Sequence, residues 1–190
     1  SRLRSVADIV ASAQIRPGML RFATAGNATP PHLTGELLKQ AAGIHLTHIP
    51  YSSAPAAAIA MLAGDVEIVI GPPSVLGPHL RSGRLRPLAT AAPRRIEALP
   101  DLPTFTELGF SGVALRDGIA MVAPAGTRAP VIERMNAEIL SAIREPEVRQ
   151  RLEAIGMEIA GLGPVDLGAF LRDERRRLEK LIREAHIRAD

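Results

Sequence analysis

Short apolar segments alternate with amphipathic ones through the first two thirds of the 190-residue chain. The apolar pattern predicts strands at 20–24, 47–50, 66–70 and 85–91, of which the β-branched segment 66–70 is the clearest. Helical spacing, with a capping residue or proline at the start and glycine at the end, predicts one helix before the first strand, at 6–16, and others between the strands, at 30–42, 54–63 and 74–82. Strands that alternate with helices of about ten residues indicate right-handed crossovers and a mainly parallel sheet with flanking helices.

The last third of the chain has a different balance. One further strand is expected at 119–123, followed by helices that begin after Thr127, at Pro146 and at Pro164. A single strand among three helices has no sheet of its own to complete. The sequence therefore predicts an α/β body followed by a mostly helical segment.

Composition limits the classes of protein to consider. With 46% hydrophobic and 23% charged residues the chain is typical of globular proteins. No segment approaches the ~20 apolar residues of a membrane span, and residues 1–4 lead into no apolar region of a signal peptide. The absence of cysteine excludes disulfides, thiolate metal sites and a cysteine nucleophile.

The net charge of +3 favours anionic partners only weakly. Nucleic-acid binding is not expected, because aromatic residues make up only 3% and acidic residues interleave with the arginines at 172–177.

The segment 24–32 is the strongest candidate for a binding site. It follows an expected strand and opens an expected helix, and Gly26 and Asn27 tolerate tight-turn backbone angles. A helix N-terminus of this kind binds carboxylate or phosphate through N–H groups and the helix dipole. The alternative is an ordinary strand-to-helix turn capped by Thr29. His32, in the first helical turn, could donate to an anion or hydrogen-bond a neighbouring loop.

Two similar loops, 51–55 and 71–74, follow the next two expected strands. Three loops after three parallel strands would lie along one edge of the sheet, where open α/β sheets bind ligands. Alternatively, they are only the strand-to-helix connections that every parallel sheet requires. His45 and His48, on opposite faces of a strand, are expected to be structural and to hold no metal. No nucleophile or general base indicates catalysis, because Asp65 and Glu67 are the only carboxylates near these loops.

A series of segments also matches one family in order and spacing over nearly the whole chain: 22–36, 48–51, 54–56, 62–68, 78–89, 94–104, 107–109, 123–127 and 146–148. These segments resemble the motifs of Bug-type solute receptors, the extracytoplasmic binding proteins of tripartite tricarboxylate transporters. The resemblance implies a periplasmic-binding-protein type II-like fold with two α/β lobes. It implies lobe two at 1–113 and the C-terminal part of lobe one at 114–190. Lobe one is therefore expected to be incomplete, because the family pattern begins well before Ser1 and its earlier residues carry the first half of that lobe.

What the resemblance implies about function is a periplasmic receptor, not an enzyme, with no cofactor and no metal. Such a receptor captures a small carboxylate, which could be a di- or tricarboxylate or an amino acid, and delivers it to a membrane permease. The implied ligand-binding residues lie in the three loops: Thr24, Ala25, Gly26, Asn27, Ala28, Thr29, His32, Tyr51, Ser52, Ser53, Ala54, Gly71, Pro72 and Ser74. The chain departs from the family pattern at Ala28, a usual glycine, at Gly71, often aspartate, and at Asp117, usually aromatic.

Two other classes stay open. One is an interaction module that does not transport and that forms a homo-oligomer through the incomplete lobe, because the apolar faces of 119–190 need a cover. The other is a small α/β enzyme that acts on an anionic substrate. Only the three loops, which are suited to bind an anion, favour it.

Overall fold

A computed structural model of the chain describes residues 2–115, 117–155 and 157–188. The chain divides into two compact units. Unit 1 comprises Ser1–Asp117 together with Leu181–Asp190, and unit 2 comprises Gly118–Lys180. The two units are described separately below.

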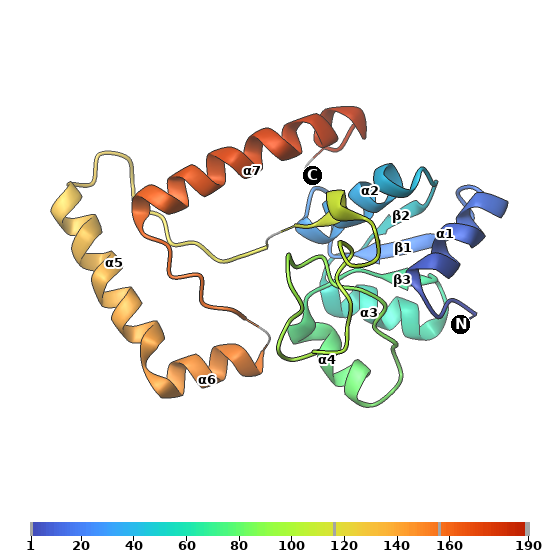
Figure 1. The fold of residues 1–190 in the computed structure, drawn as a ribbon, viewed down its shortest axis with the longest axis horizontal. Helices are drawn as coiled ribbons and strands as arrows, with labels where there is room; N and C mark the ends of the chain where they lie inside the picture. The colour runs from blue at the N-terminus through green and yellow to red at the C-terminus, as the bar shows by residue number, and fades with distance from the viewer. Residues whose placement is uncertain (1, 116, 156, 189–190) are drawn as a thin grey trace. The chain divides into compact units, whose positions relative to one another are not determined.

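Unit 1 is built around a three-stranded parallel sheet (Figure 1). The strands are β1 (Arg21–Thr24), β2 (Thr47–Pro50) and β3 (Ile68–Val69), in the spatial order β2-β1-β3. Phe22 of β1 pairs with His48 on one side and with Ile68 on the other. The expected parallel sheet is therefore confirmed, although β3 is shorter than the apolar segment 66–70 suggested.

The helices of unit 1 come before, between and after the strands along the chain. They are α1 (Val6–Ile15), α2 (Pro30–Ala42), α3 (Ala54–Ala63), α4 (Pro73–Arg81) and the short 3₁₀ helix η1 (Ser111–Val113). Their ends follow local chemistry, because Ser5 and Asp8 form a reciprocal capping box at the start of α1. Gly43 and Gly64, both with left-handed backbone angles, end α2 and α3.

The two faces of β1 pack against different helices. Phe22, fully buried, joins Ile9 and Ala13 of α1 in one core cluster. Ala23, which points to the opposite face, joins Ala57 of α3 in a second cluster. Figure 1 shows α2 and α3 on opposite sides of the sheet. Unit 1 is thus a three-layer α/β arrangement that leaves the carboxyl ends of the strands at one edge.

The expected strand at 85–91 is wrong. In this segment the only bridge the structure describes is an isolated one between Thr90 and Thr104. Pro87 lacks the N–H that a ladder needs. The proline-rich segment that follows is held by side chains instead, because Thr104 and Glu107 exchange hydrogen bonds and Arg95 donates to Glu107 at 2.9 Å.

Unit 2 is helical. It contains α5 (Ala129–Arg144) and α6 (Pro146–Ala154), and α7 (Pro164–Glu184) begins in it and ends in unit 1. The strand expected at 119–123 is wrong, because these residues pair with no other strand in the described part of the chain. Thr127 donates its hydroxyl to the Pro124 carbonyl and does not cap α5, which begins after Arg128.

Candidate functional site

The three candidate loops begin side by side at the carboxyl edge of the sheet. The Tyr51 N–H donates to the Thr24 carbonyl at 2.9 Å, and the Ile70 N–H donates to the Ala23 carbonyl at 3.0 Å. A Cβ atom on Gly26 would lie 3.9 Å from the Tyr51 carbonyl oxygen. The loops after β1 and β2 are therefore in contact, and the loop after β3 starts beside them.

The strand order places the first loop at the centre of this edge. From β1 the chain crosses to β2 on one side, and β3 then pairs on the other side. In open parallel sheets the point where the crossovers change direction leaves a crevice outside the carboxyl ends of the strands. That point lies between β1 and β3, beside the loop that begins at Thr24.

The loop after β1, residues 25–29, is tightly folded. Gly26 has φ 117° and Ala28 has φ 54°, so both adopt left-handed conformations. The Thr24 hydroxyl and the Thr29 hydroxyl lie 3.1 Å and 2.9 Å from the Gly26 carbonyl oxygen. Thr29 occupies the N-cap position of α2 but its side chain accepts no capping bond, so the cap expected from sequence is wrong.

Prolines reduce the number of free amides at the start of α2. Pro30 and Pro31 have no N–H, and the Ala28 N–H is bound to the Nδ1 atom of His32 at 3.1 Å. Within the described residues, the N–H groups of Gly26, Thr29 and His32 have no hydrogen-bond acceptor. The segment 24–32 contains no carboxylate. The loop can therefore offer three amide donors and the helix dipole to an anion.

The other two loops offer less. Ser53 accepts from the Ala56 N–H and caps α3, and Tyr51 packs half-buried on the Ala23 cluster. Two prolines, Pro72 and Pro73, begin α4. Ser52 and Ser74 are exposed, whereas Gly71 lies close to the Leu76 side chain. The sequence-predicted residues are thus brought to one edge, but their donors concentrate in the first loop.

A pair of stacked imidazoles lies beneath this loop. The rings of His32 and His48 are 3.8 Å apart and nearly parallel, and Phe22 stacks on His48 at 4.8 Å. The His48 Nε2 atom lies 2.7 Å from the Thr24 hydroxyl. Sequence reasoning treated His48 as structural and missed this contact. The pairing of β1 with β2 is the signal that could have found it, because it sets His48 beside Phe22 and next to Thr24.

Burial and neighbouring charges set the protonation of this cluster. Burial, and then the positive charge that His32 would carry, lower the pKa of His48 to about 4. Burial alone would raise the pKa of Glu36, but the nearby His32 ring, whose Nε2 atom lies 3.6 Å from the carboxylate, and the hydrogen bond from Lys39 outweigh it and hold that pKa below its usual value. The Lys39 Nζ atom lies 2.8 Å from the Glu36 carboxylate. The loop therefore rests on neutral His48 and on a buried, paired carboxylate.

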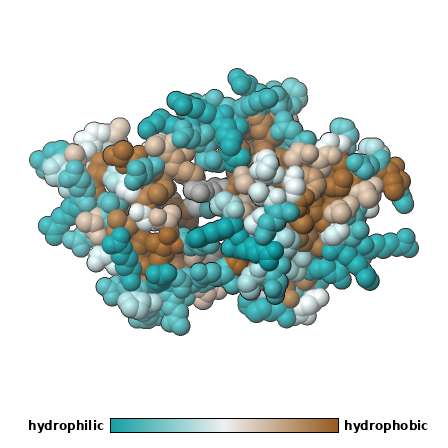
Figure 2. All heavy atoms as spheres, viewed as in Figure 1, coloured by the Kyte–Doolittle hydropathy of each residue, from teal (hydrophilic) through white to brown (hydrophobic). Residues whose placement is uncertain are grey.

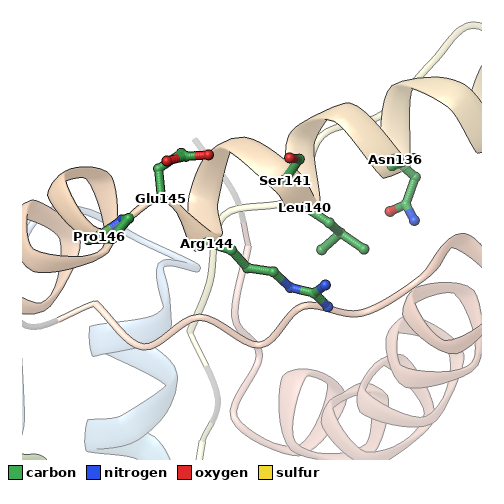
Figure 3. Close-up of a pocket in the computed structure, with 7 residues that line it drawn as sticks. Asn136, Leu140, Ser141, Arg144, Glu145 and Pro146 are labelled. Atoms are coloured by element: carbon green, nitrogen blue, oxygen red, sulfur yellow. The ribbon is translucent and has the colours of Figure 1, made fainter.

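The structure describes a hollow elsewhere, on unit 2. This open hollow of about 560 Å³ lies along α5 and the start of α6 (Figure 3). It is lined by Asn136, Ala137, Leu140, Ser141, Arg144, Glu145 and Pro146. None of the ligand-binding residues expected from sequence lines it.

The described residues hold no group of three or more histidine, aspartate or glutamate side chains placed to bind a metal ion. Among the same residues, no helix has both the length and the hydropathy to cross a membrane.

Comparison with known proteins gives the same class as the fold. Residues 1–187 match the tripartite tricarboxylate transporter family receptor. The chain is 34% identical over 191 residues to a UPF0065 protein from the tcbD–tcbE intergenic region of Pseudomonas sp. strain P51, covering all of this chain and 57% of that protein. It is 32% identical over 184 residues to the protein BugT of Bordetella pertussis, covering 96% of this chain and 56% of BugT.

Among solved structures, the R. palustris protein Rpa4515 with adipate superposes with a TM-score of 0.87 at 28% identity, covering 99% of this chain and 63% of that one. The chain therefore belongs to the tripartite tricarboxylate transporter receptor family, and the resemblance to Bug-type receptors is confirmed. Members of this family are periplasmic solute receptors of the periplasmic-binding-protein fold, not enzymes. The chain spans a little over half the length of the curated relatives it matches.

Proposed function

We propose that the chain acts as a periplasmic receptor. In this role it binds a small dicarboxylate and presents it to the membrane permease of a tripartite transporter. In this proposal one ligand carboxylate lies against the loop that joins β1 to α2. The observation that carries it is the set of three amides, on Gly26, Thr29 and His32, that lack an acceptor in the described residues. Family membership supports the solute class, and the neighbour Rpa4515 was solved with adipate.

The proposal extends to the rest of the predicted site. Tyr51, Ser52, Ser53 and Ala54 after β2 would form its second wall, because a Cβ on Gly26 would reach the Tyr51 carbonyl. The loop after β3, with Gly71, Pro72 and Ser74, would form its third. We also propose the lobe division that the family resemblance implies, with lobe two at 1–113 and the C-terminal part of lobe one at 114–190.

Replacing Gly26 by valine tests the site. A β-branched side chain at φ 117° is strained and would distort the loop against Tyr51. We expect adipate binding, followed by isothermal titration calorimetry, to weaken at least about tenfold, which corresponds to about 1.4 kcal/mol.

Gly64→Val is the matched control. Gly64 also has a left-handed angle, φ 91°, but lies at the end of α3, where a Cβ would contact nothing within 4 Å. The control should lose stability through the same kind of strain while its adipate affinity changes little. Equal affinity in Gly26→Val and the unchanged chain would refute the site. Failure of the unchanged chain to bind adipate or other di- and tricarboxylates would count against receptor function in this chain.

Self-association is a second candidate function, favoured by exposed apolar side chains in unit 2. Ile119, Val122 and Val165 are each more than 80% exposed, and Figure 2 shows apolar residues at the surface of this unit, on the left. We propose that this surface pairs with a second copy of the chain.

Light scattering during size-exclusion chromatography tests this pairing. We expect a mass above that of one chain that rises with concentration, and a single-chain mass for Val122→Asp. Ile15→Asp, at a 78% exposed position of unit 1, is the control and should behave as the unchanged chain. A single-chain mass at every concentration would exclude the pairing.

A further inference from the structure

Ala28 adopts a backbone conformation that alanine rarely takes. Its φ of 54° lies in the left-handed region, where glycine is the usual residue because a Cβ crowds the backbone. Gly26, two residues earlier, also has a positive φ, so the chain turns sharply between them. An alanine held in this conformation needs a contact that favours it.

The contact comes from His32, one helical turn further along the chain. The Ala28 N–H donates to the Nδ1 atom of His32 at 3.1 Å. An imidazole nitrogen accepts a hydrogen bond only when it carries no proton, so the proton of neutral His32 lies on Nε2.

The surroundings of His32 favour this tautomer. Its Nε2 atom lies 3.6 Å from the carboxylate of Glu36, which Lys39 holds by an ion pair. On one face the ring stacks on His48 at 3.8 Å, and His32 is 93% buried. Glu36, Lys39 and His48 are the titratable groups that face His32 in the described residues. The ring is therefore fixed in plane and in the direction of its proton.

We propose that His32 is a positioning residue of the ligand loop: its unprotonated Nδ1 holds the Ala28 N–H and so maintains the left-handed turn that arranges the free amides of Gly26 and Thr29. This inference rests on the proposed function where it concerns the ligand, and on the hydrogen bond alone where it concerns the loop. His32 then acts on the ligand through Ala28, because both of its ring nitrogens face the chain itself.

A proton on Nδ1 would reverse this contact. Two N–H groups would then face each other at the Ala28 turn, and the hydrogen bond that holds this turn would be lost.

The first experiment needs no ligand. Long-range ¹H–¹⁵N spectra of the full chain report which ring nitrogen of each histidine carries the proton. We expect His32 to have its proton on Nε2 at neutral pH, and the Ala28 amide to exchange slowly with solvent. A proton on Nδ1 of His32, or an Ala28 amide that exchanges as fast as an open loop, would overturn the inference.

Variants of His32 separate the hydrogen bond from packing. His32→Leu keeps an apolar side chain in the core but removes the acceptor, and we expect Ala28 amide exchange to accelerate at least tenfold. In His32→Asn the side-chain oxygen can lie near the place of Nδ1 and accept the same hydrogen bond, so the Ala28 exchange rate should return most of the way to that of the unchanged chain. Equal exchange rates in both variants would contradict the inference. His45→Leu, at an exposed histidine of the same unit, is the matched control.

Ala28→Gly keeps the inference testable if His32→Leu folds poorly. Glycine adopts φ 54° without a stabilising hydrogen bond. His32→Leu alone should therefore weaken adipate binding about tenfold, whereas adding His32→Leu to the Ala28→Gly variant should weaken it much less. Identical losses in both backgrounds would overturn the inference. If the unchanged chain binds no adipate, the proposed function fails, while the tautomer and the Ala28 amide still decide the role of His32.

Discussion

Gly35→Ala is expected to destabilise unit 1 severely, although the same change in most helices is stabilising. Gly35 lies in the middle of α2, where alanine is normally favoured over glycine by about 0.5–1 kcal/mol. A methyl group at this position, however, would lie 2.3 Å from Cε2 and 2.6 Å from Cζ of Phe22. Carbon atoms in contact sit about 3.5–4.0 Å apart. One of the two side chains, or the helix itself, must move.

Phe22 has little room to give way. Its side chain is fully buried, stacks on His48 at 4.8 Å and packs against Ile9 and Ala13 of α1. Overpacking a core of this kind costs about 1–3 kcal/mol or more, which is a large share of the stability of a small unit. Urea denaturation followed by circular dichroism should therefore show a midpoint well below that of the unchanged chain.

Two further variants identify the clash as the cause. Gly168→Ala, in α7, is the matched control, because its Cβ would meet only the flexible end of Arg172 at 3.4 Å, and it should be neutral or slightly stabilising. Phe22→Leu in the Gly35→Ala background removes the clashing ring atoms, so the double variant should be more stable than the sum of the two single effects predicts. Additive losses would show that Gly35 matters for a reason other than its distance from Phe22.

The same helix shows how far local sequence signals reach. The start and end of α2 could be predicted, because proline at the first position and glycine after the last are chemical markers in the sequence itself. The capping box of α1 and the bounds of α3 were predicted for the same reason. The close approach of Gly35 to Phe22 could not be predicted, since it depends on how α2 lies across β1.

Strand predictions failed where pairing is not local. Segments 85–91 and 119–123 have the apolar character of strands, yet neither forms a ladder in the described residues. An apolar segment becomes a strand only when another strand lies beside it, and the pattern along one segment carries no information on that neighbour. The parallel direction of the strands was predicted, because strands that alternate with helices imply right-handed crossovers, whereas the order β2-β1-β3 came only from the structure.

The candidate loops were predicted from sequence, but the amide donors that they offer were not. Glycine and asparagine after a strand indicated the loop, and the parallel sheet indicated that three loops meet. The loss of helix amides to Pro30 and Pro31 was readable in the sequence, whereas the capture of the Ala28 amide by His32 required the folded geometry. The stack of His32 on His48 could not be predicted either, because the two residues are 16 positions apart in the sequence. The pairing of β2 with β1 places His48, and the position of α2 places His32.

Acid is expected to destabilise the folded chain from about pH 6.5 downward because of His48. Its pKa falls from an ordinary value of 6.5 to about 4 on folding, since burial, and then the positive charge that a protonated His32 would carry, oppose its protonation. Between these two values the unfolded chain binds a proton that the folded chain does not. Stability is therefore fully present above pH 6.5 and falls as the pH is lowered toward 4.

Urea denaturation at half-unit pH steps measures this effect, because the slope of unfolding free energy against pH gives the protons taken up on unfolding. His48 should contribute an uptake that approaches one proton near pH 5. His48→Gln, which retains a polar group for the Thr24 hydroxyl but does not titrate, should lose this contribution, whereas His45→Gln at an exposed position should keep it. The carboxylates of Glu67 and Glu107, whose pKa values are lowered by Arg21 and by the Thr104 amide, respectively, weaken the fold only below about pH 4.5. A slope between pH 6.5 and 5 that is the same with and without His48 would therefore show that this imidazole is not held neutral beneath the loop.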